Sequence, residues 1–129
     1  MAQVKVFGLK RNLALCKKEI SDIIHSALIS ELGLPPDKKF QRFIPMEKED
    51  FLFPADRTAK YTIIEISMFE GRTEKAIKAL LKKIMAEMES RLGMHPNDTE
   101  ITVFQSAKHC WGIRGKTGDE LALKYKVDV

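Results

Sequence analysis

The sequence predicts one domain of the α/β (α+β) class, in which two tandem strand–helix–strand (βαβ) units form a four-stranded mixed sheet with two helices on one face. The first observation is a repeat: residues 32–37 (LGLPPD) recur at residues 92–97 (LGMHPN), sixty positions later. A long apolar helical pattern precedes each copy, and short strand-like segments flank each helix. Self-similarity at this period indicates a duplicated supersecondary unit. We expect a single domain at residues 1–129, with units at about 2–44 and 61–104, a loop at 45–60 and a tail at 105–129.

The first unit begins with a strand at residues 3–7 and continues as a helix at residues 13–32. Apolar residues recur in that helix at spacings of three and four, which gives one apolar stripe: Leu13, Cys16, Ile20, Ile23, Ile24, Ala27, Leu28 and Leu32. Cys16 is therefore interpreted as a buried free thiol. Gly33 suits a left-handed helix end, and the prolines after it cannot continue the helix. Residues 40–44 form the second expected strand.

The second unit follows a loop at residues 45–60 that carries two prolines and a charge cluster but no period. Residues 61–69 are rich in β-branched and aromatic side chains, which is typical of a strand. Thr73 suits the N-cap of a helix at residues 73–92. A fourth strand is expected at residues 100–104, before a glycine-punctuated tail.

Two helices can cover only one face of such a sheet. We expect each unit to form a parallel strand pair with a right-handed crossover. The uncovered face would then carry these residues or their neighbours: Lys5, Phe7, Gln41, Glu65, Ser67 and Phe69. That mixture is too apolar for comfortable exposure to water, so a closed homo-oligomer is expected to cover it.

Composition limits the environment and the partners. Hydrophobic content of 44% with 31% charged residues is ordinary for a globular domain. No apolar run approaches the roughly 20 residues that span a bilayer, so we expect no membrane partner. Two cysteines make no disulfide framework, and no signal peptide is apparent, which favours the cytoplasm. The net charge of +4 is spread over both helices, so we expect small anions and not nucleic acid as partners.

Several short motifs resemble the tautomerase superfamily, which includes 4-oxalocrotonate tautomerase, malonate semialdehyde decarboxylase and macrophage migration inhibitory factor. They are residues 33–37 (GLPPD), 56–58 (DRT) and 70–74 (EGRTE), followed by a late Trp111. The chain is similar to a long-chain bacterial subgroup of that superfamily. The resemblance implies a homotrimer with sites between subunits.

The N-terminus departs from the family pattern. The resemblance implies a catalytic proline that is exposed when the initiator methionine is removed, but Ala2 stands there. An α-amine with an ordinary pKa of about 7.7 to 8 can still act as a base, provided that Met1 is removed. The family's first-unit arginine falls at Asn12, its water-activating aspartate at Lys38, and a second arginine at Glu70.

By the same resemblance, the substrate-binding candidates are Arg72, Arg57, Arg114 and Trp111. A cation at a helix start gains nothing from the macrodipole, so Arg72 either binds a ligand or a neighbouring subunit, or is a surface residue without a specific role. Arg57 either binds a ligand or pairs with Asp56 or with a carboxylate of a neighbouring subunit. Arg114 either binds a ligand or is an exposed tail residue, and Trp111 is a packing anchor at a subunit boundary or a ligand contact.

His109 and Cys110 are the residues nearest to a metal-binding pattern. Neighbours on a strand point to opposite faces and cannot converge on one ion. No spaced Cys/His pair supports them, so we expect neither a metal nor a cofactor.

Two functions stay open. The first is a tautomerase-like isomerase or lyase acting on a small keto or enol carboxylate, with the Ala2 amine as base and an arginine holding the carboxylate. The alternative is a catalytically silent homotrimer that binds a small anion or a protein partner.

Overall fold

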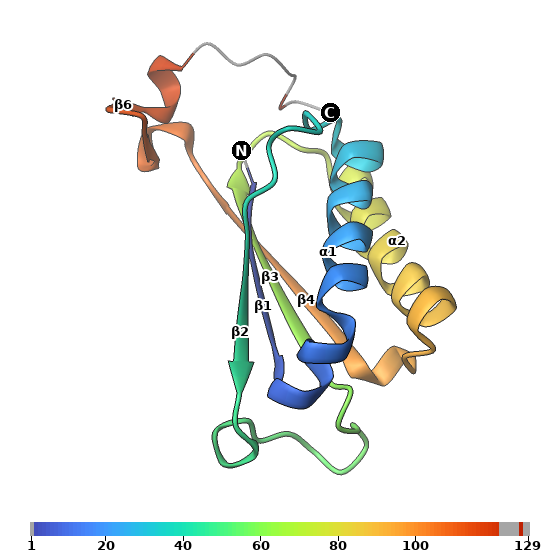
Figure 1. Ribbon diagram of the computed structural model, residues 1–129. Helices are drawn as coiled ribbons and strands as arrows, with labels where there is room; N and C mark the ends of the chain where they lie inside the picture. Colours follow the sequence, from blue (N-terminus) through green and yellow to red (C-terminus); the bar gives the residue numbers. More distant parts are fainter. Residues whose placement is uncertain (1, 122–126, 128–129) are drawn as a thin grey trace.

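The computed structural model describes residues 2–121 and Val127. A four-stranded sheet has the strand order β2-β1-β3-β4. The strands are β1 (Ala2–Leu9), β2 (Gln41–Met46), β3 (Thr62–Phe69) and β4 (Thr99–Ser106). Helices α1 (Lys10–Leu32) and α2 (Glu74–Leu92) both lie on one face of this sheet (Figure 1). The predicted fold class is confirmed.

The pairing makes the sheet mixed. Strands β1 and β2 are parallel, as are β3 and β4, and the two βαβ units join through the antiparallel β1–β3 pair. In that central pair Val4 lies opposite Ile66, and both are buried under the helices. Each unit connects its two parallel strands through a helix. The apolar stripes of both helices are therefore buried against one face of the sheet.

Both helices end as the sequence predicts. Gly33 (φ 68°) and Gly93 (φ 62°) adopt the left-handed conformation, and their backbone amides donate hydrogen bonds to carbonyls of the last helical turn. Thr73 caps α2, since its side chain accepts a hydrogen bond from the amide of Ala76. Helix α1 begins at Lys10, three residues before the predicted start, because its first turn is polar and lies outside the apolar stripe.

The core is continuous between the helices and the inner sheet face. Its fully buried large side chains come from both units and alternate along the central strands: Leu13, Ile20, Ile23, Ile24, Leu32, Ile64, Ile66, Met68, Leu80, Ile84 and Met88. Cys16 is a free cysteine, as predicted, but it is only partly buried and packs against the edge of this cluster.

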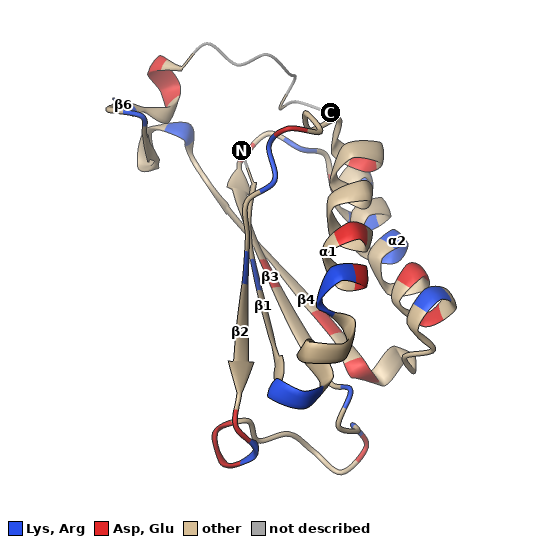
Figure 2. Cartoon of the chain, in the orientation of Figure 1, with Lys and Arg blue, Asp and Glu red and all other residues tan. Residues whose placement is uncertain are grey.

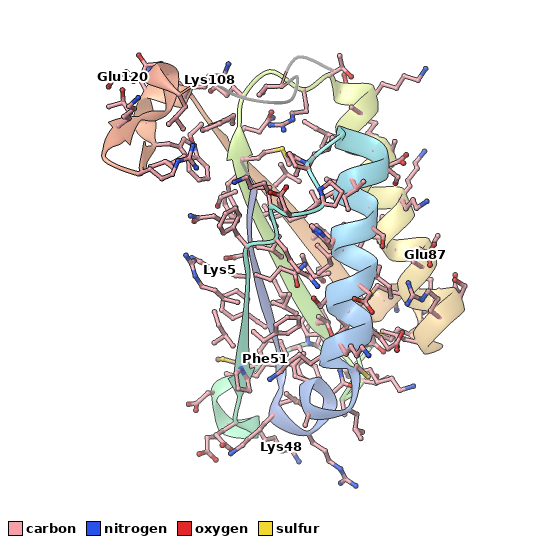
Figure 3. The ribbon with its side chains drawn as sticks, turned by 45° about the horizontal axis from the view of Figure 1, so that its top comes forward. Lys5, Lys48, Phe51, Glu87, Lys108 and Glu120 are labelled. Carbon is pink, nitrogen blue, oxygen red and sulfur yellow. The ribbon has the colours of Figure 1, made fainter. Side chains whose placement is uncertain are left out.

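Both α1 and α2 leave the other face of the sheet uncovered (Figure 1). It carries Lys5, which Figure 3 shows pointing away from the helices, and Glu65, which lies opposite Lys5. Phe104 on β4 is 48% exposed there. Gln41 was expected on this face but lies on the helix side, because it pairs in register with the buried Val4. Its Nε2 donates to the Ser21 carbonyl at 3.2 Å.

The loop and the tail have more structure than predicted. Strand β2 continues to Met46, and a 3₁₀ turn η1 (Lys48–Asp50) follows it. The tail contains η3 (Lys108–Cys110), a hairpin of β5 (Gly112–Ile113) with β6 (Lys116–Thr117), and η4 (Gly118–Glu120). His109 and Cys110 therefore lie in a 3₁₀ turn and not on a strand. Residues 122–126 and 128–129 of the expected tail lie outside the described residues.

Figure 2 shows where the charged residues lie on the two helices. In α1 the basic residues Lys10, Arg11, Lys17 and Lys18 precede the acids, and in α2 four lysines lie between Glu74 and Glu87 (Figure 2). Neither helix is apolar enough over sufficient length to cross a membrane, within the part of the chain that the structure describes.

Candidate functional site

Ala2 begins the central strand β1 and lies opposite Met68 near the end of β3. Its residue is only 5% exposed, because its side chain turns toward the helices with Val4 and Val6. Met1 lies outside the described residues. The backbone nitrogen of Ala2 is therefore positioned by the sheet, at the end where β3 passes into α2.

Arg72 comes from the short segment between β3 and α2, just before the N-cap Thr73. It is 6% exposed, and its Nη1 donates to the Phe69 carbonyl at 3.1 Å. Because Phe69 directly follows the strand partner of Ala2, the β1–β3 register brings Ala2 and Arg72 to the same end of the sheet. Burying a guanidinium is costly unless it is hydrogen-bonded, and the bond to the Phe69 carbonyl offsets part of that cost and fixes the side chain.

Trp111 contributes the aromatic wall at that end. Its ring meets Phe69 edge to face, with centroids 5.2 Å apart. Its Nε1 donates to Ser106 Oγ at 2.9 Å. The segment after it returns to the sheet at Gly118, where a side chain would collide with the Lys108 carbonyl and touch Phe69. Trp111 and Gly118 thus hold this part of the tail against Phe69.

Arg114 lies at the tip of the β5–β6 hairpin. It has a positive φ of 51°, as Gly115 does at 80°, so the two residues form the tight turn between these strands. Arg114 is exposed, and Figure 1 shows the hairpin projecting beyond the end of the sheet. The hairpin therefore lies at the same end of the sheet as the N-terminus but projects beyond the strands (Figure 1).

Arg57 lies at the opposite end of the sheet. Its Nη1 donates to Asp56 at 2.7 Å, and its Nη2 donates to Glu100, which is paired with Ile63 early in β3. The guanidinium also lies 5.6 Å from the Tyr61 ring centroid. A single chain therefore places Ala2, Arg72 and Trp111 at the same end of the sheet, and Arg57 at the opposite end.

The groups around Arg57 perturb one another. Hydrogen bonds to Asp56 and Glu100 raise the pKa of Arg57, and its hydrogen bond lowers the pKa of Asp56. Hydrogen bonds from Tyr61 and then Arg57 lower the pKa of Glu100. Burial, followed by the hydrogen bond to Glu100, raises the pKa of Tyr61 to about 12. The pattern is that of a closed ion-pair network, with the acids ionised and the phenol neutral at pH 7.

Several partners in this region were missed from the sequence. Phe51, Phe53 and Tyr61 form an aromatic cluster with centroids 5.3–5.6 Å apart, which fixes the middle of the 45–60 loop. Asp98 accepts two hydrogen bonds from Thr58, forty residues away. The spacing of the aromatic residues was the one feature of the sequence that could have indicated this cluster. No local pattern could have predicted the contact between Thr58 and Asp98, because they lie forty residues apart.

Metal ligation has little support in the geometry. Within residues 2–121 and 127, the histidine, cysteine and acidic side chains form no group of three that could hold an ion. His109 and Cys110 are both exposed in η3.

Comparison with known proteins identifies the family. A family model described as "Tautomerase enzyme" matches residues 38–114, which include Arg57, Arg72, Trp111 and Arg114 but not Ala2. The chain is 27% identical over 101 residues to "Probable tautomerase YusQ" of Bacillus subtilis (strain 168), covering 74% of this chain and 80% of that protein.

Solved structures show the same fold at low identity. Native fused 4-OT superposes with a TM-score of 0.79 at 18% identity, covering 92% of this chain and 98% of that one. Malonate semialdehyde decarboxylase superposes with a TM-score of 0.77 at 16% identity, covering 88% and 92%. Because the family model spans more than half of the sequence, the chain belongs to the tautomerase enzyme family.

Proposed function

We propose that this protein is an isomerase or lyase for a small keto or enol carboxylate, acting at the end of the sheet that carries Ala2 and Arg72. The observation that carries the proposal is the strand register. Ala2 pairs with Met68, and Arg72 binds the carbonyl of the next residue, Phe69. The register places a potential base and a cation at the same end of the sheet, which supports the proposal that they serve one site.

The chemistry requires a free amine. After removal of Met1, the neutral Ala2 amine takes a proton from the carbon next to the substrate carbonyl and returns it to another position of the resulting enolate. Arg72 binds the substrate carboxylate through its planar fork and offsets the developing negative charge. Phe69 and Trp111 supply an apolar wall that limits water and favours the neutral amine.

The uncovered sheet face supports a homotrimer. It carries exposed Phe104 as well as charged Lys5 and Glu65, and three fused 4-OT structures with this fold are described as trimers. In such an assembly Arg57 or Arg114 of a neighbouring subunit could supply a second cation. A silent trimer that binds an anion through Arg72 is the competing proposal, because alanine stands where the family resemblance implies proline.

Processed and unprocessed protein distinguish these proposals. Untagged protein is checked by intact mass and assayed with phenylpyruvate, alongside a form that keeps Met1. The enzyme proposal expects turnover only after Met1 removal, increasing with pH through a pKa at or below the ordinary α-amine value of about 7.7 to 8. Ala2→Pro should be equally or more active. Equal turnover with Met1 retained contradicts the Ala2 mechanism, and no turnover by the processed and proline forms favours the silent trimer.

Arg72 is tested separately. Arg72→Lys keeps the charge but loses the bidentate fork, so phenylpyruvate KM should rise about tenfold while kcat changes less. Lys82→Ala, an exposed change on α2, is the matched control and should leave KM unchanged. Thermal unfolding of each variant separates a loss of binding from a loss of fold, and an unchanged KM in folded Arg72→Lys contradicts the assignment.

A further inference from the structure

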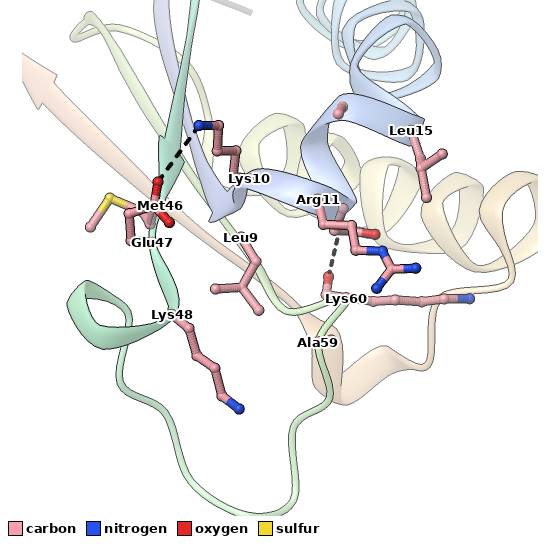
Figure 4. A pocket seen from close by; sticks show the side chains of 11 residues that line it. Leu9, Lys10, Arg11, Leu15, Met46, Glu47, Lys48, Ala59 and Lys60 are labelled. Carbon is pink, nitrogen blue, oxygen red and sulfur yellow. Dashed lines mark hydrogen bonds and ion pairs between the residues drawn. The ribbon is translucent and has the colours of Figure 1, made fainter.

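A cavity of about 710 Å³ lies at the other end of the sheet, where β1 passes into α1. Three segments line it: the start of α1, the end of β2 with the residues after it, and the two residues before Tyr61 (Figure 4). Ala2, Arg72 and Trp111 do not line it. Its volume falls within the range of about 300 to 1,000 Å³ that is usual for small-molecule sites.

The walls of this cavity are mainly apolar. Leu9, Leu15 and Met46 contribute side chains from three different elements, and Figure 4 shows Leu9 pointing toward the 45–60 loop. Leu15 is 80% exposed although it is a large aliphatic residue on α1. An apolar ligand body placed here would remove that surface from water, at about 25 cal/mol per Å² covered.

The rim is strongly basic. Lys10, Arg11, Lys48 and Lys60 line the cavity with a single acid, Glu47, which pairs with Lys10 at 3.7 Å. Among the described residues Arg11, Lys48 and Lys60 form no ion pair, and the nearby acids of η1 do not line the cavity. Arg11 and Lys60 extend in the same direction in Figure 4. The rim therefore presents a net positive charge to any ligand.

The start of α1 adds to this potential. Helix α2 opens with a Thr73 cap and Glu74, whereas α1 opens with Lys10 and Arg11, no acid, and no side-chain cap from Leu9. Positive charge at a helix N-terminus opposes the macrodipole, so these cations do not stabilise α1. The arrangement instead favours an external anion.

Asn12 is a second polar group directed to this region. It lines the cavity and is 9% exposed. Its Nδ2 donates to the Lys60 carbonyl at 3.4 Å, and its Oδ1 accepts from the Cys16 thiol at 3.8 Å, both long contacts. A buried amide with partners this weak can still gain free energy from a ligand oxygen.

The sequence repeat relates the β1–α1 junction, where this cavity lies, to the β3–α2 junction beside Ala2. Asn12 and Arg72 lie sixty positions apart, as do the turns η1 and η3. The chain thus has two similar junctions between a strand and a helix, one beside Ala2 and the other beside Tyr61. The second junction carries a different polar set and the apolar cavity.

We propose that this cavity is a second ligand site, which binds a small amphipathic carboxylate. The carboxylate contacts Arg11 and Lys60, and the apolar chain of the ligand packs against Leu9, Leu15 and Met46. The guanidinium fork matches a planar carboxylate, and Lys60 supplies a second point charge. The site is independent of any turnover at Ala2.

The test is an amide chemical-shift titration of the full folded chain with octanoate, octanol and acetate. Octanoate is expected to shift the amides of residues 9–15, 46–48 and 59–60. Octanol lacks the charge and acetate lacks the chain, so each should bind about tenfold more weakly than octanoate or worse. The Arg11→Gln/Lys60→Gln double variant should bind octanoate about tenfold more weakly. Lys75→Gln/Lys82→Gln, on the exposed face of α2, is the matched control and should bind like the parent.

Three results would overturn the proposal. Shifts confined to residues 69–72 and 111 would assign octanoate to the Ala2 end of the sheet. Equal binding of octanol would remove the role of the carboxylate. Unchanged octanoate affinity in the Arg11→Gln/Lys60→Gln variant would remove the role of the basic rim, and since both residues are exposed, loss of fold does not confuse that comparison.

Discussion

Thr58 and Asp98 join the long loop to the second unit through two hydrogen bonds to one carboxylate. The Thr58 amide donates to Oδ1 at 2.8 Å and its hydroxyl donates to Oδ2 at 2.6 Å, while Asp98 itself is 2% exposed. A buried carboxylate with both oxygens occupied is well satisfied. This pair therefore fixes where the loop ends and β3 begins.

Asp98→Ala should lower the free energy of unfolding by about 2 kcal/mol, because it leaves the Thr58 donors without their acceptor. Asp98→Asn keeps one acceptor oxygen and should cost less. Urea denaturation measures both changes, with Glu89→Ala on the exposed face of α2 as the control. A loss in Asp98→Ala no larger than in the control would show that the pair contributes nothing to stability.

Tyr61 should make stability depend on pH in the alkaline range. Its folded pKa is raised to about 12, above the ordinary value of about 10, so the folded state holds the phenolic proton more tightly. Stability from this group is complete below pH 10 and falls as pH increases toward 12. The Tyr61→Phe variant should lose that dependence and the late rise in tyrosinate absorbance. Titration of Tyr61 near pH 10 would contradict the expectation.

Gly118 should be intolerant of a side chain. A Cβ there would lie 2.3 Å from the Lys108 carbonyl oxygen, so Gly118→Ala must displace the tail from Phe69. Trp111 is the single tryptophan, and its emission should shift to longer wavelength as its ring leaves Phe69. Gly112→Ala has nothing within 4 Å of the new Cβ and is the matched control. Identical emission from both variants would mean that the tail does not depend on this contact.

The uncovered sheet face should bury itself in a trimer. Sedimentation equilibrium is expected to give three times the 14.7 kDa chain mass. Phe104→Glu places a charge on that face and should shift the mass toward one chain, whereas Met85→Glu on α2 should not. A concentration-independent mass near 14.7 kDa for the parent would rule out the trimer.

The sequence predicted what depends on local pattern. The ends of both helices at Gly33 and Gly93 and the Thr73 cap follow from residues within one turn, so each could be assigned in isolation. Gln41 was placed on the wrong face because the β1–β2 register depends on both strands. A shift of one residue reverses every side chain of a strand.

Only part of the candidate site could be predicted from local sequence patterns. Arg72 is adjacent to a predicted helix, and its position near Ala2 follows from the central pairing of the two units. Arg57 could not be assigned to the opposite end without that pairing, and its contact with Glu100 crosses 43 residues. The hairpin at Arg114 was missed because an arginine in the left-handed conformation is an uncommon turn residue.

The strand order also constrains how the protein can be made. Strand β1 is synthesised first, but one of its two neighbours, β3, begins at Thr62 and follows the whole first unit. Until β3 leaves the ribosome, the nascent chain can pair only β1 with β2, and a two-stranded sheet is marginally stable in water. The open edge of β1 is then a template for pairing with other chains. Ribosome-stalled chains that end before Phe69 should therefore be cut by a brief protease pulse, whereas chains that have released β4 should resist it.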